Sequence, residues 1–74
     1  MSIQSSGIVR RYIVARGYGF IAPDDNGPDV FVHCSAVVAA GMRILESGMP
    51  VSFDIAEDRK GRPIAVNLSL RGGR

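Results

Sequence analysis

Residues 16–33 read RGYGFIAPDDNGPDVFVH, and the fold of the chain is decided in this stretch. Two short runs, residues 18–22 and 29–34, stand on either side of the polar turn 24–28. In both runs aromatic and aliphatic side chains alternate with a period of two, which is the spacing of a β-strand. One phase carries Tyr18, Phe20, Phe31 and His33, and the other carries Ile21, Val30 and Val32. We predict two adjacent strands that bury the aliphatic phase and present four flat rings on the opposite face.

Four rings on the outer face of a small protein have little structural purpose, and a platform for stacking unpaired bases explains them better. The basic residues agree with this interpretation, because eight of the nine are Arg, whose guanidinium stacks on rings and forks onto phosphates. The net charge is only +2, although the isoelectric point is about 9.2. Such a small charge argues against tight binding of duplexes through long-range attraction.

The rest of the sequence predicts three further strands. Residues 7–13 form the first, and their alternation is broken at Arg10 and Arg11, which predicts a bulge there. Residues 51–56 and 64–70 alternate apolar with polar side chains, the apolar positions being 51, 53 and 55 in one strand and 64, 66, 68 and 70 in the other. Five short strands predict an all-β fold, a five-stranded antiparallel Greek-key barrel of the OB-fold type.

Only residues 35–41 have a helical composition, with Ser35 as the expected N-cap and Gly41 as the terminator. A length of 74 residues allows one domain. We therefore divide the chain into a flexible N-terminus (1–6), the barrel domain (7–70) and a basic C-terminal tail (71–74).

The single cysteine excludes a disulfide within the chain and gives no set of metal ligands. Residues 1–6 have neither the basic cluster nor the apolar run of a signal peptide, and no apolar stretch reaches the length of a transmembrane helix. We expect a cytoplasmic monomer with no cofactor, no small-molecule substrate and no membrane partner. A strand-exchanged dimer is the alternative oligomeric state.

The two central runs resemble the paired motifs of the cold-shock domain family. That family carries Lys/Arg-Gly-Phe/Tyr-Gly-Phe-Ile on its second strand and Val-Phe-Val-His on its third, and here these are residues 16–21 and 30–33. The resemblance extends over about residues 7–70, and two linked motifs at the right separation are more specific than one. It implies a barrel that binds single-stranded RNA or DNA with little sequence preference and has no catalytic centre. Bacterial members of this length act as RNA chaperones.

The first strand departs from the family pattern. The family usually has Lys-Trp-Phe-Asn where this chain has residues 10–13, RRYI, so Arg11 replaces an exposed Trp. Two more ring positions of the family carry Cys34 and Met42 here. Since each stacked base contributes roughly 1–3 kcal/mol, we predict weaker binding than in a Trp-bearing relative. The guanidinium of Arg11 recovers part of this loss if it lies on a base.

We expect nucleic acid to contact nine residues, with rings stacking on bases and arginines contacting phosphates. These candidates are Arg10, Arg11, Tyr12, Arg16, Tyr18, Phe20, Asp29, Phe31 and His33. Tyr12 stands at the broken alternation, so core and binding face are equally consistent with the sequence. Asp29 either accepts a hydrogen bond from a base or caps the turn. The charged turn 57–63, with Arg59, Lys60 and Arg62, is expected to be solvated, with contact to a longer nucleic-acid strand as the minor alternative.

Gly17 and Gly19 within the first motif have two explanations. Either a base approaches the backbone closely there, or the barrel needs a bulge or sharp curvature to close. The sequence leaves both explanations open.

Two other classes of function remain to be weighed. A protein-interaction or oligomerisation module on the same fold would use the face made more apolar by Ile13, Cys34 and Met42. An enzyme is disfavoured, because adjacent strand residues such as His33 and Cys34 point to opposite faces and the chain is too small for a deep pocket. Salt dependence separates the first two functions, since only phosphate contacts make the affinity fall steeply with salt.

Overall fold

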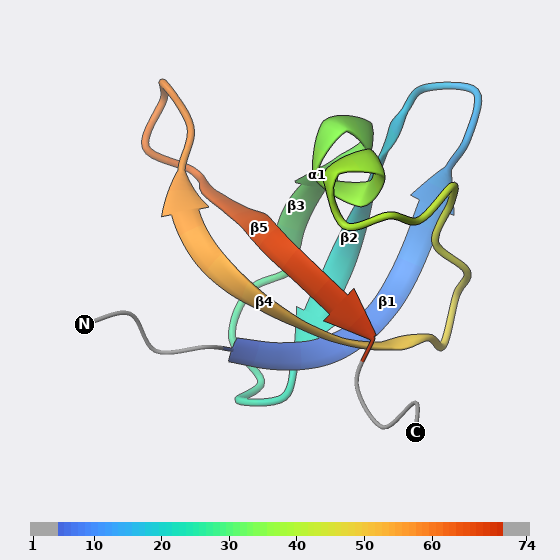
Figure 1. Ribbon diagram of the computed structural model, residues 1–74. Helices are drawn as coiled ribbons and strands as arrows, with labels where there is room; N and C mark the ends of the chain where they lie inside the picture. Colours follow the sequence, from blue (N-terminus) through green and yellow to red (C-terminus); the bar gives the residue numbers. More distant parts are fainter. Residues whose placement is uncertain (1–4, 71–74) are drawn as a thin grey trace.

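Five strands close into a barrel, with one short helix beside it, in the computed structural model, which describes residues 5–70 (Figure 1). The elements are β1 (Ser5–Ile13), β2 (Tyr18–Pro23), β3 (Val30–His33), α1 (Cys34–Ala39), β4 (Pro50–Glu57) and β5 (Pro63–Leu70). The strand order is β1-β2-β3-β5-β4, and β4 closes the barrel against β1. The predicted all-β, five-stranded barrel is confirmed. Its one parallel contact, between β3 and β5, pairs Phe31 with Ile64.

The strand limits differ slightly from those predicted. β1 begins at Ser5, which pairs with Phe53 of β4, so the expected start at Gly7 is two residues too late. The strand β3 is shorter than predicted, because Asp29 precedes it and Cys34 already belongs to α1. Pairing with β4 explains the first difference, since two polar serines show no apolar alternation in the sequence. Residues 1–4 of the expected flexible N-terminus and the tail 71–74 lie outside the described residues.

The predicted bulge in β1 is confirmed at Arg10. Val9 is opposite Ile21 and Arg11 is opposite Phe20, so Arg10 is an extra residue on β1. A bulge increases the local twist and shifts the alternation by one position. Arg10 and Arg11 are therefore both exposed, while Val9 is buried.

The core is aliphatic apart from one ring. It consists of Val9, Ile21, Val30, Val32, Val37, Leu45, Val51, Phe53, Ala65 and Leu68. The inward phase predicted for the central strands is confirmed. The apolar alternation in β4 and β5 predicts burial only in part: Val51, Phe53 and Leu68 are buried, but Ile55 is 49% exposed and Leu70 is 53% exposed. In β5 the left-handed backbone of Asn67 (φ 53°) changes the phase, so Ala65 and Leu68 face inward.

The helix starts differently from the prediction. His33, not Ser35, is its N-cap, and the imidazole Nδ1 accepts the backbone N–H of Ser35 at 3.1 Å. Ser35 lies inside the first turn, where its hydroxyl Oγ is 3.0 Å from the same ring nitrogen. The helix ends as expected, because Gly41 follows the C-cap Ala40 with a left-handed backbone (φ 81°).

Candidate nucleic-acid interface

Three rings form a contiguous cluster on the outside of β2 and β3. Tyr18 and Phe31 are stacked, with ring centroids 5.4 Å apart and planes at 28°. Phe20 meets both rings edge-on, at 6.0 Å from Tyr18 and 5.9 Å from Phe31. The antiparallel register brings them together, since Phe20 is opposite Phe31 and Tyr18 is opposite His33. We call Tyr18, Phe20 and Phe31 the aromatic face; all three rings are half-buried, so each keeps surface for a ligand.

The aromatic face is the floor of an open groove of about 430 Å³. Two loops supply its walls: Pro28 and Asp29 come from the β2–β3 loop, while Arg62 and Pro63 come from the β4–β5 turn and the start of β5. The parallel contact between β3 and β5 explains the second wall, because it places Ile64 directly beside Phe31. Three groove residues, Pro28, Arg62 and Pro63, were not among the candidates predicted from the sequence. The only signal for Arg62 and Pro63 was the charge of the turn, which is also the signature of a solvated loop.

Asp29 forms an ion pair with Arg10. The distance between Arg10 Nε and Asp29 Oδ2 is 2.9 Å, and the two side chains are 58% and 36% exposed. An ion pair this exposed contributes little to stability. The ion pair holds Arg10, the bulge residue of β1, at the edge of the groove. The contact uses Nε of Arg10, and the two terminal nitrogens of the guanidinium take no part in it. The sequence offered a base or the turn as the partner of Asp29, and neither prediction included Arg10, with which Asp29 pairs in the structure.

The other two candidate arginines are also exposed. Arg11 is opposite Phe20 in the β1–β2 register, so its side chain emerges on the side of the sheet that carries the aromatic face. Arg16 lies in the turn between β1 and β2, where its backbone N–H is bonded to Ile13. Neither Arg11 nor Arg16 lines the groove. Arg11 shares the outer face of the sheet with the rings, so a flat group there can continue the aromatic face, whereas Arg16 belongs to the turn.

Tyr12 is the one candidate that faces inward. It is opposite Gly19, its ring packs against the core, and burial, followed by the nearby Cys34, raises the pKa of its hydroxyl. A Cβ at Gly19 would lie 2.4 Å from the Arg11 carbonyl oxygen and 2.8 Å from Tyr12 Cδ1. The backbone of Gly19 is therefore closely approached by Arg11 and Tyr12 of β1, and this contact within the protein explains the glycine. The curvature explanation for Gly19 is favoured over the approach of a base.

His33 is exposed at the end of β3, beside Tyr18. Because its Nδ1 accepts the N–H of Ser35, the neutral ring carries its proton on Nε2, which can donate to a base or phosphate. The thiol of Cys34 lies 3.8 Å from Nδ1, closer than expected for neighbours on a strand. The reason is that Cys34 starts the helix and no longer follows strand alternation.

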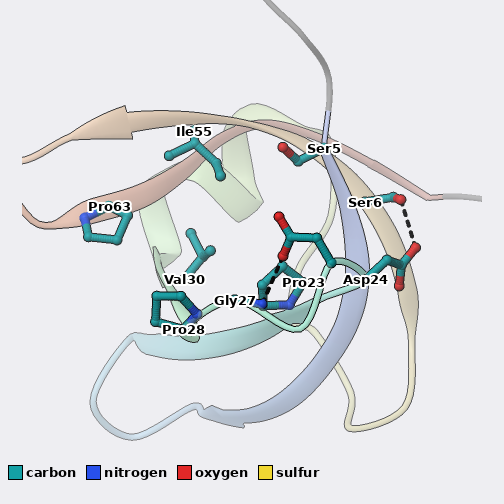
Figure 2. A pocket seen from close by; sticks show the side chains of 10 residues that line it. Ser5, Ser6, Pro23, Asp24, Gly27, Pro28, Val30, Ile55 and Pro63 are labelled. Carbon is teal, nitrogen blue, oxygen red and sulfur yellow. Dashed lines mark hydrogen bonds between the residues drawn. The ribbon is translucent and has the colours of Figure 1, made fainter.

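A second hollow, at the mouth of the barrel, adjoins the aromatic groove. It measures about 290 Å³ and shares Pro28 and Pro63 with the groove (Figure 2). We call it the barrel mouth; Val30 and Ile55 line its apolar side. Figure 2 shows Asp24 accepting a hydrogen bond from Ser6 Oγ at 2.8 Å, and Asp25 Oδ1 accepts the N–H of Gly27 at 2.8 Å. Carboxylates at this mouth repel phosphates, whereas guanidinium groups border the aromatic groove.

Membrane-spanning helices and metal-ligand clusters were two further features to look for in the described residues. Within residues 5–70, none of the helical structure has the length and apolar character needed to cross a membrane. The same residues contain no group of three or more His, Cys, Asp or Glu side chains arranged to hold a metal ion.

A closed five-stranded barrel with rings and arginines on one outer face defines an OB-fold protein of the oligonucleotide-binding class. The sequence profile described as the "'Cold-shock' DNA-binding domain" matches residues 5–71, and the chain belongs to this cold-shock domain family of nucleic-acid-binding proteins. The resemblance expected from the two motifs is therefore confirmed.

Similar proteins occur in several bacteria. Cold shock protein CspA of Rhizobium meliloti is 51% identical over 65 residues, which are 86% of this chain and 94% of that protein. Probable cold shock protein y4cH of Sinorhizobium fredii is 45% identical over 67 residues, covering 89% and 97% respectively. Cold shock protein ScoF of Streptomyces coelicolor is 46% identical over 65 residues, covering 88% and 96%. The similarity spans nearly the full length of these single-domain relatives.

Proposed function

We propose that this protein binds single-stranded RNA or DNA with little sequence preference and acts as an RNA chaperone, with bases stacking on Tyr18, Phe20 and Phe31. The observation that carries the proposal is the half-buried ring cluster on the floor of an open groove. A base inserted beside these rings gains stacking area that the free protein leaves in contact with water. Because every base has a flat face, such contacts carry little sequence preference.

The preference for single strands follows from what the rings can reach. In a duplex the flat faces of the bases are stacked on each other, so a ring gains access only when the strand is unpaired. A protein that binds the unpaired form shifts the pairing equilibrium toward that form by mass action. This coupling is the physical basis of the proposed chaperone activity, and it requires no catalytic step.

The arginines are proposed to contact the phosphates that accompany the stacked bases. Arg10 and Arg11 emerge on the β1 side of the aromatic face, and Arg16 lies in the turn that leads to β2. Each phosphate contact to a single strand makes log K fall with log salt by about 0.7. Three contacts therefore imply a slope near 2, and each further phosphate contact adds about 0.7.

Tyr12 enters the proposal in a different role from the other eight candidates. Its ring packs against the core below β1, so we assign it to supporting the bulge that presents Arg10 and Arg11. Asp29 orients Arg10 and lines the groove, where its second carboxylate oxygen can accept a hydrogen bond from a base. We propose a cytoplasmic monomer as the working form.

A protein-interaction module is the second candidate. It is favoured by Ile13, which is opposite Tyr18 and extends the aromatic face with an apolar side chain. A partner bound mainly through apolar contacts would show an affinity nearly independent of salt. The salt dependence of the affinity therefore discriminates between the two functions.

The test is fluorescence anisotropy with a labelled single-stranded RNA octamer, the DNA octamer and a duplex of the same sequence, each at several salt concentrations. The expected result is binding of both single strands, a preference over the duplex, and a log–log salt slope near 2. Unwinding of a weak RNA hairpin labelled with a fluorophore and quencher then measures chaperone activity. Equal or tighter binding of the duplex, or absence of binding at low salt, would contradict the proposal.

A further inference from the structure

We infer that Arg62 is a further phosphate-binding residue of the groove and that Asp58 holds it in position. This inference rests on the proposed binding of single strands to the aromatic face. Arg62 belongs to the turn between β4 and β5, which extends beyond the body of the barrel (Figure 1). The sequence alone favoured a solvated loop at this place and did not distinguish Arg62 from Arg59 and Lys60.

The carboxylate of Asp58 organises the whole turn. Its Oδ1 accepts the backbone N–H groups of Lys60 at 2.8 Å and Arg62 at 2.9 Å. Its Oδ2 accepts Arg62 Nε at 3.0 Å. The backbone of Asp58 is also bonded to Arg62 and Gly61, and Gly61 supplies the left-handed backbone (φ 79°) that the turn needs. The side chain of Arg62 is therefore held by a hydrogen bond to the same turn that carries Arg62.

The anchored guanidinium remains available to a ligand. The Arg62 side chain is 69% exposed, and Arg62 lines the groove together with the three rings of the aromatic face. The contact with Asp58 uses Nε, which leaves the two terminal nitrogens, with four N–H groups, for a phosphate. An arginine that is already oriented loses less conformational freedom on binding than a free one.

The opposite side of the groove has the same arrangement. Arg10 is anchored through Nε to Asp29, as Arg62 is anchored through Nε to Asp58. Asp29 and Arg62 both line the groove, and the rings form its floor between the two loops. A strand whose bases stack on the rings would therefore meet one carboxylate-anchored guanidinium on each side.

The hydrogen bonds also keep Asp58 charged. The backbone N–H of Arg62, followed by that of Lys60 and by the guanidinium, lowers the pKa of the Asp58 carboxyl below its ordinary value, despite an opposing desolvation effect. The anchor is thus ionised at neutral pH. Among the three cations of this turn, Arg62 is the one whose side chain is bonded to Asp58 and that lines the groove. Arg59 and Lys60 are exposed and do not line it.

The test compares Arg62→Ala with Arg59→Ala, which removes an equal charge from the same turn. Affinity for the single-stranded octamer is measured by anisotropy across salt concentrations, and the melting temperature of each variant verifies folding. Arg62→Ala is expected to weaken binding about three- to ten-fold at low salt and to reduce the salt slope by about 0.7. Arg59→Ala is expected to leave the slope unchanged. Equal effects of the two substitutions would overturn the inference, because they would indicate net charge alone.

The positioning role of Asp58 requires a double-mutant cycle. Asp58→Asn is expected to weaken binding when Arg62 is present and to have no weakening effect in the Arg62→Ala background. The same effect in both backgrounds would overturn the assignment of Asp58. Phe31→Ala is measured in parallel: if it weakens binding while Arg62→Ala behaves like Arg59→Ala, only this inference fails. If the unmodified protein does not bind the octamer, the proposed function itself fails.

Discussion

The aromatic groove and the barrel mouth are neighbouring hollows that share Pro28 and Pro63, yet they offer a ligand different chemistry. The groove has three rings on its floor, and its walls carry the Arg62 guanidinium and the Asp29 carboxylate, which is paired with Arg10. The barrel mouth has aliphatic side chains and two carboxylates, and no ring lines it. The two proline-bordered hollows therefore differ in which part of a nucleotide they suit. Both hollows expose apolar surface. The aromatic rings and the Arg62 guanidinium distinguish the groove from the barrel mouth.

The largest effect is expected from removing a ring from the groove. Phe31 contacts both Tyr18 and Phe20, so Phe31→Ala loses its own stacking surface and loosens the other two rings. We expect a loss of roughly 1–3 kcal/mol of binding free energy, which is about a five- to 150-fold increase in Kd. Anisotropy titration with the single-stranded octamer measures it.

The matched control lies in the barrel mouth. Ile55 is a 49% exposed apolar residue that lines the mouth, so Ile55→Ala removes exposed apolar surface from the other hollow without removing a ring. Its Kd should stay within about two-fold of the unmodified protein, because no stacked base is lost. Similar losses of affinity for Phe31→Ala and Ile55→Ala would contradict the assignment of nucleic-acid binding to the groove rather than to the barrel mouth.

Adding a ring to the groove side should have the next largest effect. Arg11 is opposite Phe20, at the position where Trp is usual in the family, so Arg11→Trp extends the aromatic face. We expect Kd to fall about three- to 30-fold, since the new ring adds up to roughly 1–3 kcal/mol and the guanidinium contribution is lost. The salt slope should fall by about 0.7 at the same time. Arg59→Trp, which adds the same ring outside the groove, should leave the affinity unchanged.

Removing a negative charge from the barrel mouth should have a smaller effect. Asp25→Asn keeps the side-chain oxygen that accepts the Gly27 N–H, so the loop geometry is retained. We expect Kd to decrease by less than about two-fold, because exposed charges outside the binding path act weakly through salt. A ten-fold gain in affinity for the octamer would show that the strand crosses the mouth, and the separation of the two hollows would then be wrong.

The smallest effect is expected on the stability of the protein, from replacing Asp58 in the β4–β5 turn beside the groove. The pKa of Asp58 is lowered in the folded protein from its ordinary value of 3.8, first by the backbone N–H of Arg62. A carboxyl whose folded pKa is depressed contributes stability above the unfolded pKa and loses it as the pH falls through the folded value. Asp58→Asn should therefore lower the urea midpoint near pH 7, and the difference from the unmodified protein should shrink below about pH 4.

That pH series has its own control in Asp24→Asn, at the barrel mouth. The carboxylate of Asp24 accepts a hydrogen bond from Ser6, but it does not organise the β4–β5 turn. A pH-independent difference for Asp58→Asn would contradict the electrostatic account of the turn. If Asp24→Asn lowered the affinity for nucleic acid as much as Arg62→Ala, the division between groove and mouth would also be in doubt.

Much of the fold and half of the groove follow from local pattern. Alternation over residues 18–22 and 29–34 predicts which side chains are buried and which rings share a face, because strand geometry sends neighbouring side chains to opposite sides. The broken alternation predicts the bulge at Arg10, which the register confirms. The two motifs are also sufficient to identify the cold-shock domain family, since their residues and spacing are unusual.

Other features depended on contacts between distant segments. Tyr12 faces the core because it meets Gly19 across the β1–β2 pair, and the sequence left that choice open. The phase of β5 changes at Asn67, where the left-handed backbone accompanies a hydrogen bond from its Nδ2 to Asp54 Oδ2 on β4, at 2.9 Å. His33 caps the helix in place of Ser35 because the imidazole at the end of β3 reaches the first turn. None of these contacts leaves a periodic signal in the chain.

The sequence by itself determined the strands, the core phase of β2 and β3, and the three rings of the aromatic face, because each depends on residues within one or two positions of each other. The tertiary structure decided what surrounds those rings. Closure of the barrel through the parallel contact of Phe31 with Ile64 brings Arg62 and Pro63 to the groove, and the bulge brings Arg10 to Asp29. Such neighbours arise from how the barrel closes over long separations in the chain, and local alternation carries no information about that closure.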